Sequence, residues 1–321
     1  MRYFTVDEHG QMQLAEMDKP NPGDYEVIIK VKAFGINRAD LLQKQGKYPP
    51  PRGESQVLGL EVSGTLESVG SMVTAWHEGD RVCALVPGGG YAEYVRVRAE
   101  HLMPLPDNMS FSDGAGLMEV FLTAYQALFW LGKLAEGQKV LIHAGASGVG
   151  SAAIQLAKSR GAQVAITASN ADKLSFCGRL GADVTINYRQ QDFVDTVRER
   201  LGGVDLILDV VGGDYLNRNL RALNLDGRIV TLAILGGRFA DKLDMARLLQ
   251  KRATVMGSTL RNRSDAYKAE LIQALNKDCL ALFGQGSLMP CVDRVFSPEQ
   301  IDQAHQRMAR NENLGKLVIH W

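Results

Sequence analysis

A buried strand, a glycine-rich turn and a helix follow one another between Lys139 and Lys158, and this segment constrains the fold most. The run KVLIH at 139–143 is apolar enough for a strand that is covered on both faces. The sequence GASGVG at 145–150 follows it, and a helical pattern then continues through Ile154 and Leu156. Glycines let the backbone of such a turn approach a neighbouring group closely, because they carry no side chain. The segment therefore predicts the first strand–turn–helix unit of a parallel sheet.

Short apolar strands keep alternating with helical patterns through the middle of the chain. We expect helices over 172–180 and 193–201, and strands over 163–168, 184–187, 204–211, 228–233 and 254–256. Strands separated by helices require right-handed crossovers, so they form one parallel sheet with helices on both faces. The sequence thus predicts an α/β protein with a doubly wound parallel sheet.

The first third of the chain has a different texture, in which β-branched runs are separated by turn residues. We expect strands there over 26–33, 59–68, 80–86 and 91–96. After Ser264 we expect one helix towards Phe283, a second from Ser297 to about Arg310, and a strand over 315–319. With 321 residues, the chain is long enough for two domains. We place a catalytic domain at 1–120, joined by the C-terminal segment 265–321, and a nucleotide-binding domain at 121–264.

Charge and apolar patterning exclude several function classes. Lys plus Arg and Asp plus Glu both number 36, so the formal net charge is zero and nucleic acid is not expected as a primary partner. No apolar stretch approaches the roughly 20 residues that span a bilayer, and the N-terminal decapeptide carries charges where a signal peptide is apolar. The four cysteines are widely spaced, which disfavours a disulfide framework or structural zinc. We therefore expect a cytoplasmic protein without a membrane partner.

The glycine turn is also a candidate binding site for a dinucleotide. A helix N-terminus offers free N–H groups and a positive dipole end to a pyrophosphate. The sequence departs from G-x-G-x-x-G, because serine stands at the position of the second glycine. A tight turn without a ligand is the alternative interpretation. The predicted cofactor-binding residues here are Gly145, Ala146, Ser147, Gly148, Val149 and Gly150.

The end of the second predicted strand bears on the choice between NADP and NAD. An NAD site usually carries an acidic residue there for the ribose 2′-hydroxyl. This chain has Ser169 at that point and Lys173 one turn into the helix, and these offer a hydroxyl and a cation to a 2′-phosphate. NADP is therefore favoured. Asp172 keeps NAD open, and Lys173 is alternatively a solvated helix lysine.

These residues, taken with several further motifs, resemble the zinc-independent quinone oxidoreductases of the medium-chain dehydrogenase/reductase superfamily. Within that superfamily the chain resembles the zeta-crystallin-like enzymes, and most of all the quinone oxidoreductases induced by a tumour-suppressor transcription factor. The motifs are GINRAD at 35–40, QGKYP at 45–49, LGLEVSG at 58–64, PGGGYAEY at 87–94, LTAY at 122–125 and NLGK at 313–316. The resemblance implies a GroES-like, partly open β-barrel catalytic domain, a Rossmann domain and an active site between them. It also implies a homodimer joined through 232–237 and 254–258.

The resemblance also addresses zinc. Zinc-dependent relatives carry a Cys ligand at the position of Asn37 and a His ligand at the position of Leu60. Leucine cannot ligate zinc, so no catalytic metal is expected. Without a Lewis acid, the preferred acceptor is one that is already electrophilic.

Two residues are candidates for work on the acceptor. Asn37 is a candidate donor to an acceptor oxygen, with the N-cap of the helix from Arg38 as its alternative role. Tyr48 is a candidate hydrogen-bond donor or pocket wall, with an exposed loop tyrosine as the alternative. By resemblance, the remaining cofactor contacts are Thr123 near the nicotinamide ribose, Tyr188 near the adenine-side phosphate, and Asn313 and Lys316 from the C-terminal segment.

The function that these observations favour is NADPH-dependent reduction of quinones, or of another small electrophilic acceptor, without zinc. Electron delivery as a hydride or as net single electrons stays open. One alternative is an NADPH-dependent alkenal or enone reductase of the same superfamily. Another is a non-catalytic NADPH-binding structural or RNA-binding protein.

Overall fold

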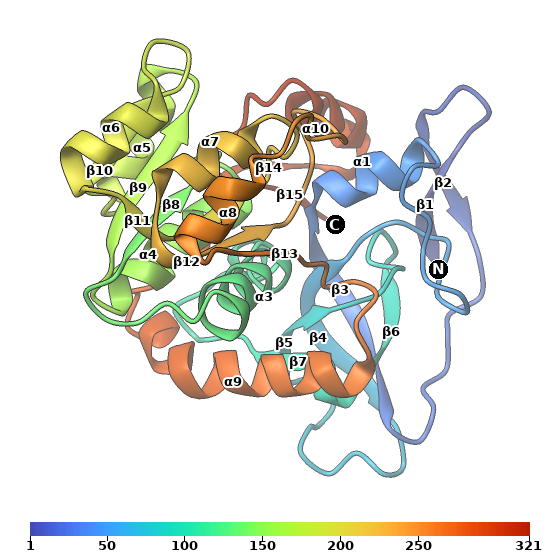
Figure 1. Ribbon diagram of the computed structural model, residues 1–321. Helices are drawn as coiled ribbons and strands as arrows, with labels where there is room; N and C mark the ends of the chain where they lie inside the picture. The colour runs from blue at the N-terminus through green and yellow to red at the C-terminus, as the bar shows by residue number, and fades with distance from the viewer. The chain divides into compact units, whose positions relative to one another are not determined.

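The computed structural model describes all 321 residues, and they form two compact units. Unit 1 comprises Met1–Leu122 and Leu260–Trp321, and unit 2 comprises Thr123–Thr259. In Figure 1, unit 1 contains the blue and red ends of the chain, and unit 2 contains most of the green and yellow segments. No helix of the chain combines the length and apolar character that a bilayer crossing requires. None of the four cysteines forms a disulfide.

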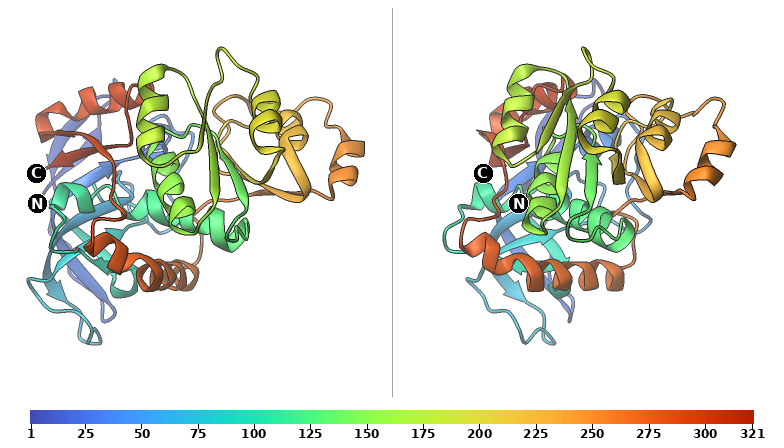
Figure 2. Two further views of the ribbon diagram at one scale, coloured as in Figure 1. Left: turned by 90° about the vertical axis from the view of Figure 1, so that its left-hand side faces the viewer. Right: turned by 60° about the vertical axis from the view of Figure 1, so that its left-hand side comes forward.

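Unit 2 is built on one six-stranded parallel sheet. Its strand order is β10–β9–β8–β11–β12–β13, so numbered from β8 along the chain the order is 3-2-1-4-5-6. Helices lie on both faces of this sheet (Figure 2). The direction of winding reverses between β8 and β11, and ligands of such sheets bind at the carboxyl ends of these strands. The strands are β8 (Lys139–Ile142), β9 (Gln163–Ala168), β10 (Val184–Asn187), β11 (Val204–Asp209), β12 (Leu223–Thr231) and β13 (Thr254–Gly257). The helices are α4 (Gly148–Ser159), α5 (Ala171–Arg179), α6 (Phe193–Leu201), α7 (Tyr215–Ala222) and α8 (Met245–Lys251).

Unit 1 is built on a seven-stranded sheet, with a separate hairpin of β1 (Arg2–Val6) and β2 (Met12–Glu16). Six of its strands follow the order β14–β15–β3–β4–β5–β7, and the seventh, β6, pairs with β3. The strands are β3 (Glu26–Ile36), β4 (Glu61–Val69), β5 (Arg81–Leu85), β6 (Tyr94–Arg98), β7 (Leu102–Pro104), β14 (Val292–Phe296) and β15 (Lys316–His320). The helices are α1 (Arg38–Lys44), α2 (Phe111–Gly114), α9 (Asp265–Gly284) and α10 (Ile301–Ala309), and α3 (Met118–Tyr125) begins here.

The pairing of β15 with β3 positions the polar centre of unit 1. The two strands are antiparallel, and Leu317 lies opposite Ile36. This register brings Lys316 beside Asn37, although the two residues are 279 positions apart in sequence. The sheet around them is apolar, with Phe34 and Tyr91 packed at 4.4 Å between ring centroids. Polar groups at this point are therefore removed from water and must pair with one another.

The predicted α/β class and the parallel sheet are confirmed, and several element bounds match closely. The strands 163–168 and 184–187 and the helix 193–201 have the bounds that periodicity predicts. The apolar segment 118–131 forms α3, which is followed by a π-helix over Gln126–Leu131. Sequence patterns did not reveal the β1–β2 hairpin, α7, α8 or β14, because these elements are short and their apolar faces are narrow.

Candidate functional site

The glycine turn of unit 2 leaves two backbone donors at the N-terminus of α4 without a partner in the chain. Ser147 caps the helix, and its Oγ accepts the Gly150 N–H at 3.0 Å. The N–H groups of Gly148 and Val149 have no acceptor within the protein. The helix dipole adds a positive field at this end. The turn can therefore hold two anionic oxygens of a dinucleotide pyrophosphate.

The first and last glycines of this turn are required by the close packing of its backbone. A Cβ atom at Gly150 would lie 2.5 Å from the Ala144 carbonyl oxygen. A Cβ atom at Gly145 would lie 2.7 Å from the Ile166 Cβ on β9. Ala144 itself has φ of +53°, a left-handed conformation that is rare for a residue with a side chain. The backbone of the turn is thus packed too closely against β9 and against its own carbonyl groups to allow a side chain at Gly145 or Gly150.

Three further predicted cofactor residues come together at the carboxyl ends of β9 and β10. The Tyr188 N–H donates to the Ala168 carbonyl oxygen at 3.2 Å, which places Tyr188 beside the strand end that leads into Ser169. Asn170 caps α5 by accepting the Lys173 N–H at 3.0 Å. Ser169 and Lys173 are half-buried, and Tyr188 is 42% exposed. This edge offers hydroxyl groups and a lysine close to the glycine turn.

A buried network around His143 joins four elements of unit 2. One ring nitrogen, Nδ1, lies 3.0 Å from the Thr167 Oγ1, and Nε2 lies 2.8 Å from the Asn219 Oδ1. Asn219 in turn donates to Asp209 Oδ2 at 3.1 Å. Burial lowers the pKa of His143, and the nearby Asp209 opposes this effect. The network ties β8, β9, α7 and β11 together and gives His143 a structural role.

The polar centre of unit 1 consists of Asn37, Glu61 and Lys316. The Lys316 Nζ lies 2.6 Å from Glu61 Oε1 and donates to Asn37 Oδ1 at 2.7 Å and to the Ile36 carbonyl oxygen at 2.8 Å. Asn37 Nδ2 donates to Glu61 Oε1 at 3.0 Å. The other carboxylate oxygen of Glu61 accepts the Glu119 N–H at 2.9 Å. All three ammonium donors of Lys316 are therefore engaged by the protein.

Asn37 also occupies the N-cap of α1, as the alternative interpretation has it. Its backbone N–H donates to Asp40 Oδ2 at 2.7 Å. Asp40 accepts a second bond from Tyr91 Oη at 3.1 Å, and Tyr91 Oη lies 3.0 Å from His305 Nε2. Burial is the main cause that raises the pKa of Asp40 to about 6 and lowers that of His305 to about 4. Asn37 is thus held at both ends, and 8% of it is exposed.

Tyr48 and Glu119 face a third group, Arg261, whose role sequence patterns did not reveal. The Arg261 guanidinium carbon lies 5.6 Å from the centroid of the Tyr48 ring. Burial raises the pKa of Tyr48, so its phenol is a proton donor at neutral pH. Burial, followed by the negative charge of Glu61, raises the pKa of Glu119 to about 8. The signal for Glu119 was its carboxyl group inside the apolar run 117–122, whereas nothing in the local sequence distinguishes Arg261 from Arg263.

The two remaining predicted cofactor residues are Thr123 and Asn313. Thr123 is half-buried on α3 and begins unit 2. Asn313 Nδ2 donates to the Gly315 carbonyl oxygen at 2.7 Å, which shapes the turn before β15. Their predicted contacts with a cofactor stay predictions.

The residues around Asn37 do not fit a zinc ion. Leu60 is a buried hydrocarbon, and the carboxylates of Asp40 and Glu61 are occupied by hydrogen bonds and by the Lys316 ammonium. No group of three or more His, Cys, Asp or Glu side chains has the arrangement of a metal site. Zinc sites in proteins use three or four such ligands.

Comparisons with known proteins agree with this architecture. Residues 148–277 match the family described as zinc-binding dehydrogenase, and residues 23–107 match the alcohol dehydrogenase GroES-like domain. The synaptic vesicle membrane protein VAT-1 homolog of Rattus norvegicus is 31% identical over 318 residues, which cover 94% of this chain and 78% of that protein. The VAT-1 homolog of Danio rerio is 32% identical, and the match covers 65% of its length. The quinone oxidoreductase of Mus musculus is 29% identical, with 99% of this chain and 97% of that protein covered.

Solved structures give the same result. The CurK enoyl reductase has a TM-score of 0.88 at 29% identity and covers 99% of this chain and 98% of its own. The Escherichia coli quinone oxidoreductase complexed with NADPH has a TM-score of 0.87 at 27% identity, and the match covers 100% of this chain and 99% of that chain. Unit 1 is thus a GroES-like domain and unit 2 a Rossmann domain. The chain belongs to the medium-chain dehydrogenase/reductase superfamily, and quinone oxidoreductases are among its full-length relatives. It is an oxidoreductase of that superfamily.

Proposed function

We propose that this protein reduces quinones, or a closely related electrophilic acceptor, with NADPH and without zinc. The observation that carries the proposal is the glycine turn after β8, which presents the unpartnered N–H groups of Gly148 and Val149 at the switch point of the parallel sheet. Bound NADPH supplies the hydride. The chain's own residues bind the dinucleotide, orient the acceptor and exclude water.

The preference for NADPH over NADH is proposed from the edge formed by β9 and β10. Ser169, Lys173 and Tyr188 offer hydroxyl groups and a cation to a 2′-phosphate, and no acidic residue ends β9. The Escherichia coli relative with NADPH supports this choice. Thr123 and Asn313 are proposed to contribute to the same cofactor.

Unit 1 supplies the residues proposed to act on the acceptor. Asn37 is fixed by Glu61 and Lys316, so we propose that Lys316 acts by orienting this amide, in addition to the cofactor contact predicted from sequence. Tyr48 provides an aromatic wall and a phenol. Preorganised donors of this kind lower the barrier because they need no reorientation during the reaction.

Reduction of a conjugated enone is the second candidate, and Glu119 favours it. This reaction needs an acid that protonates the α-carbon after hydride addition. Glu119 is protonated at neutral pH, because its pKa is raised to about 8. The enoyl reductases among the structural relatives belong to this reaction class by name.

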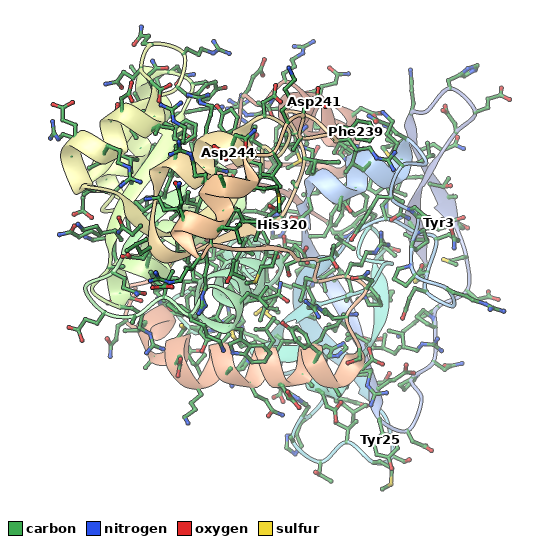
Figure 3. The ribbon with its side chains drawn as sticks, viewed as in Figure 1. Tyr3, Tyr25, Phe239, Asp241, Asp244 and His320 are labelled. Carbon is green, nitrogen blue, oxygen red and sulfur yellow. The ribbon has the colours of Figure 1, made fainter.

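A homodimer is proposed through the free edge of the Rossmann sheet. The edge strand β13 exposes Val255 to 41%, and the neighbouring segment exposes Ile234 and Leu235 to 53% and 57%. Phe239 extends from the same segment (Figure 3) and is 75% exposed. Exposed apolar groups beside an unpaired edge are typical of an interface. Sedimentation that finds only monomer at micromolar concentration would remove this proposal.

The test is oxidation of NADPH and NADH by the purified protein with ortho-quinones, para-quinones and alkenals, followed by nicotinamide absorbance. Turnover with quinones supports the main proposal, and turnover with alkenals alone supports the second. Binding of NADPH without turnover would support the non-catalytic alternative, and no binding would refute the interpretation of the glycine turn.

Tyr48→Phe separates the two roles of Tyr48. Phenylalanine keeps the ring but removes the hydroxyl group, so a wall residue retains kcat while a donor loses about tenfold or more. Tyr25→Phe is the matched control, because Tyr25 is 58% exposed in the same unit.

A further inference from the structure

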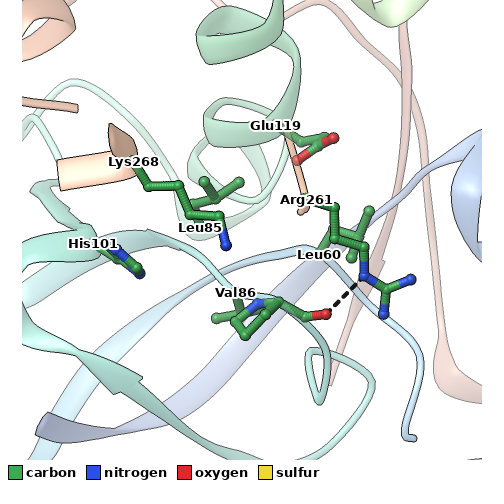
Figure 4. A pocket seen from close by; sticks show the side chains of 8 residues that line it. Leu60, Leu85, Val86, His101, Glu119, Arg261 and Lys268 are labelled. Atoms are coloured by element: carbon green, nitrogen blue, oxygen red, sulfur yellow. Dashed lines mark hydrogen bonds between the residues drawn. The ribbon is translucent and has the colours of Figure 1, made fainter. Parts of the chain in front are cut away.

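Arg261 carries a buried guanidinium group whose two terminal amino groups have no partner in the protein. The residue is 5% exposed, and neither Nη1 nor Nη2 has a hydrogen-bond acceptor. Only Nε is bonded, as it donates to the Pro87 carbonyl oxygen at 2.8 Å (dashed line in Figure 4). That bond fixes the plane of the guanidinium. An unpaired buried cation is costly, so its persistence points to an acceptor that comes from outside the chain.

A second buried cation lines the same cavity. Lys268 on α9 is 5% exposed, and Figure 4 shows its side chain extending towards the space beside Arg261. Glu119 lines the cavity too, but it forms no ion pair with either cation. The cavity measures about 10 Å³, which is room for about one water molecule. Two cations therefore face a space that accommodates about one oxygen atom.

This cavity adjoins the proposed acceptor wall. The Arg261 guanidinium carbon lies 5.6 Å from the centroid of the Tyr48 ring, within the range of cation–π contacts. Tyr48 is half-buried, and it does not line the cavity itself. An acceptor bound beside the Tyr48 ring would therefore also lie beside the Arg261 side chain, which reaches the cavity.

We propose that Arg261, assisted by Lys268, binds the carbonyl oxygen of the acceptor and stabilises the negative charge that this oxygen gains during reduction. The inference rests on the proposed function, because it concerns the same reaction. Bound NADPH would supply a hydride, with its two electrons, to an acceptor carbon that is conjugated with the carbonyl group. The displaced electron pair of the acceptor would then reside on the carbonyl oxygen beside Arg261, and one proton from solvent would complete the reduction. The substrate class is therefore a planar conjugated carbonyl compound, and donors placed at its developing oxyanion accelerate the reaction.

The test compares Arg261→Met with Arg263→Met, a matched control two residues further along the same loop whose guanidinium stacks on Tyr267. We expect Arg261→Met to lower kcat/KM for a reactive quinone or enone by about 100-fold, largely through kcat. The dissociation constant for NADPH should stay within about twofold, and the Tm should be unchanged or raised, because an unpaired buried charge has been removed. A merely structural arginine would lower the Tm instead. Arg261→Lys should restore part of kcat.

Retention of kcat/KM within about threefold in Arg261→Met would overturn the inference while leaving the proposed function intact. Failure of the wild-type protein to oxidise NADPH with every acceptor would refute the proposed function instead. The inference would then be judged with bromide, a monoatomic anion, in crystals of wild type and Arg261→Met. An anomalous peak beside the Arg261 amino groups in wild type alone would support it, and the absence of that peak would overturn it.

Discussion

Replacing Lys316 with methionine removes the ammonium group that balances the Glu61 carboxylate in unit 1. Lys316 is 2% exposed and Glu61 is fully buried, with 2.6 Å between Nζ and Oε1. Leaving one charge of such a pair unpaired costs about 3–5 kcal/mol. Each kcal/mol shifts the Tm of a domain of this size by about 2–4 °C, so Lys316→Met should lower the Tm by about 6–20 °C.

The double variant Glu61→Gln/Lys316→Met carries no buried charge at these positions and should recover most of this loss. Lys30→Met is the matched control, since Lys30 is exposed on β3, and its Tm should stay within about 2 °C of wild type. Scanning calorimetry measures all three, and quenching of intrinsic fluorescence measures NADPH affinity. A Tm of Lys316→Met equal to that of wild type would refute the argument, as would a double variant no more stable than the single one. Loss of NADPH affinity at unchanged Tm would instead favour the direct cofactor contact predicted from sequence.

Three other perturbations follow from the same structure. The pKa of Glu119 rises from 4.5 to about 8 on folding, so the free energy of unfolding should fall as pH rises through this interval. Glu119→Gln cannot ionise, so urea titrations of this variant should lack the fall with pH. An equal pH dependence in the variant and the wild type would contradict the assignment. Gly35→Ala would place a Cβ atom 2.5 Å from Glu61 Oε1 and should lower the free energy of unfolding by about 1–3 kcal/mol in the same titrations, whereas a neutral result would show that the strand can shift. Lys173→Ala should weaken NADPH binding by about tenfold and leave NADH binding unchanged, and equal losses for both cofactors would argue against a 2′-phosphate contact.

Local sequence patterns predicted the strands and helices of unit 2 well, because each of them carries its periodicity or caps within one short stretch of sequence. The apolar run at 163–168 and the capped helix at 193–201 each carry their own periodicity, and the glycine turn lies within one strand–turn–helix segment. The crossovers then leave few possible topologies. Tyr188, by contrast, was a candidate only through the family resemblance, and the parallel pairing of β9 with β10 explains why it lies at the same sheet edge as Ser169.

The polar centre of unit 1 was only partly predictable, because its partners are distant in sequence. The sequence alone made Asn37 a candidate, either as a donor to an acceptor oxygen or as the N-cap of a helix, and the structure places it at the N-cap of α1. Its actual partners, Glu61 and Lys316, meet it only through the registers of β3 with β4 and β15. Arg261 has no periodic or motif signal, and its unpaired amino groups are visible only once the surrounding side chains are placed.

The long separation between Asn37 and Lys316 has a consequence for how the chain is made. Unit 2 is continuous in sequence, so a ribosome releases it whole before the end of unit 1 has been translated. Asn37 and Lys316 are 279 residues apart, which at about 5–20 residues per second means a wait of about 14–56 s. During that interval the first segment of unit 1 lacks β14, β15 and the Lys316 ammonium that balances the Glu61 carboxylate. We therefore expect the first segment of unit 1 to be the part of the nascent chain that chaperones bind during synthesis.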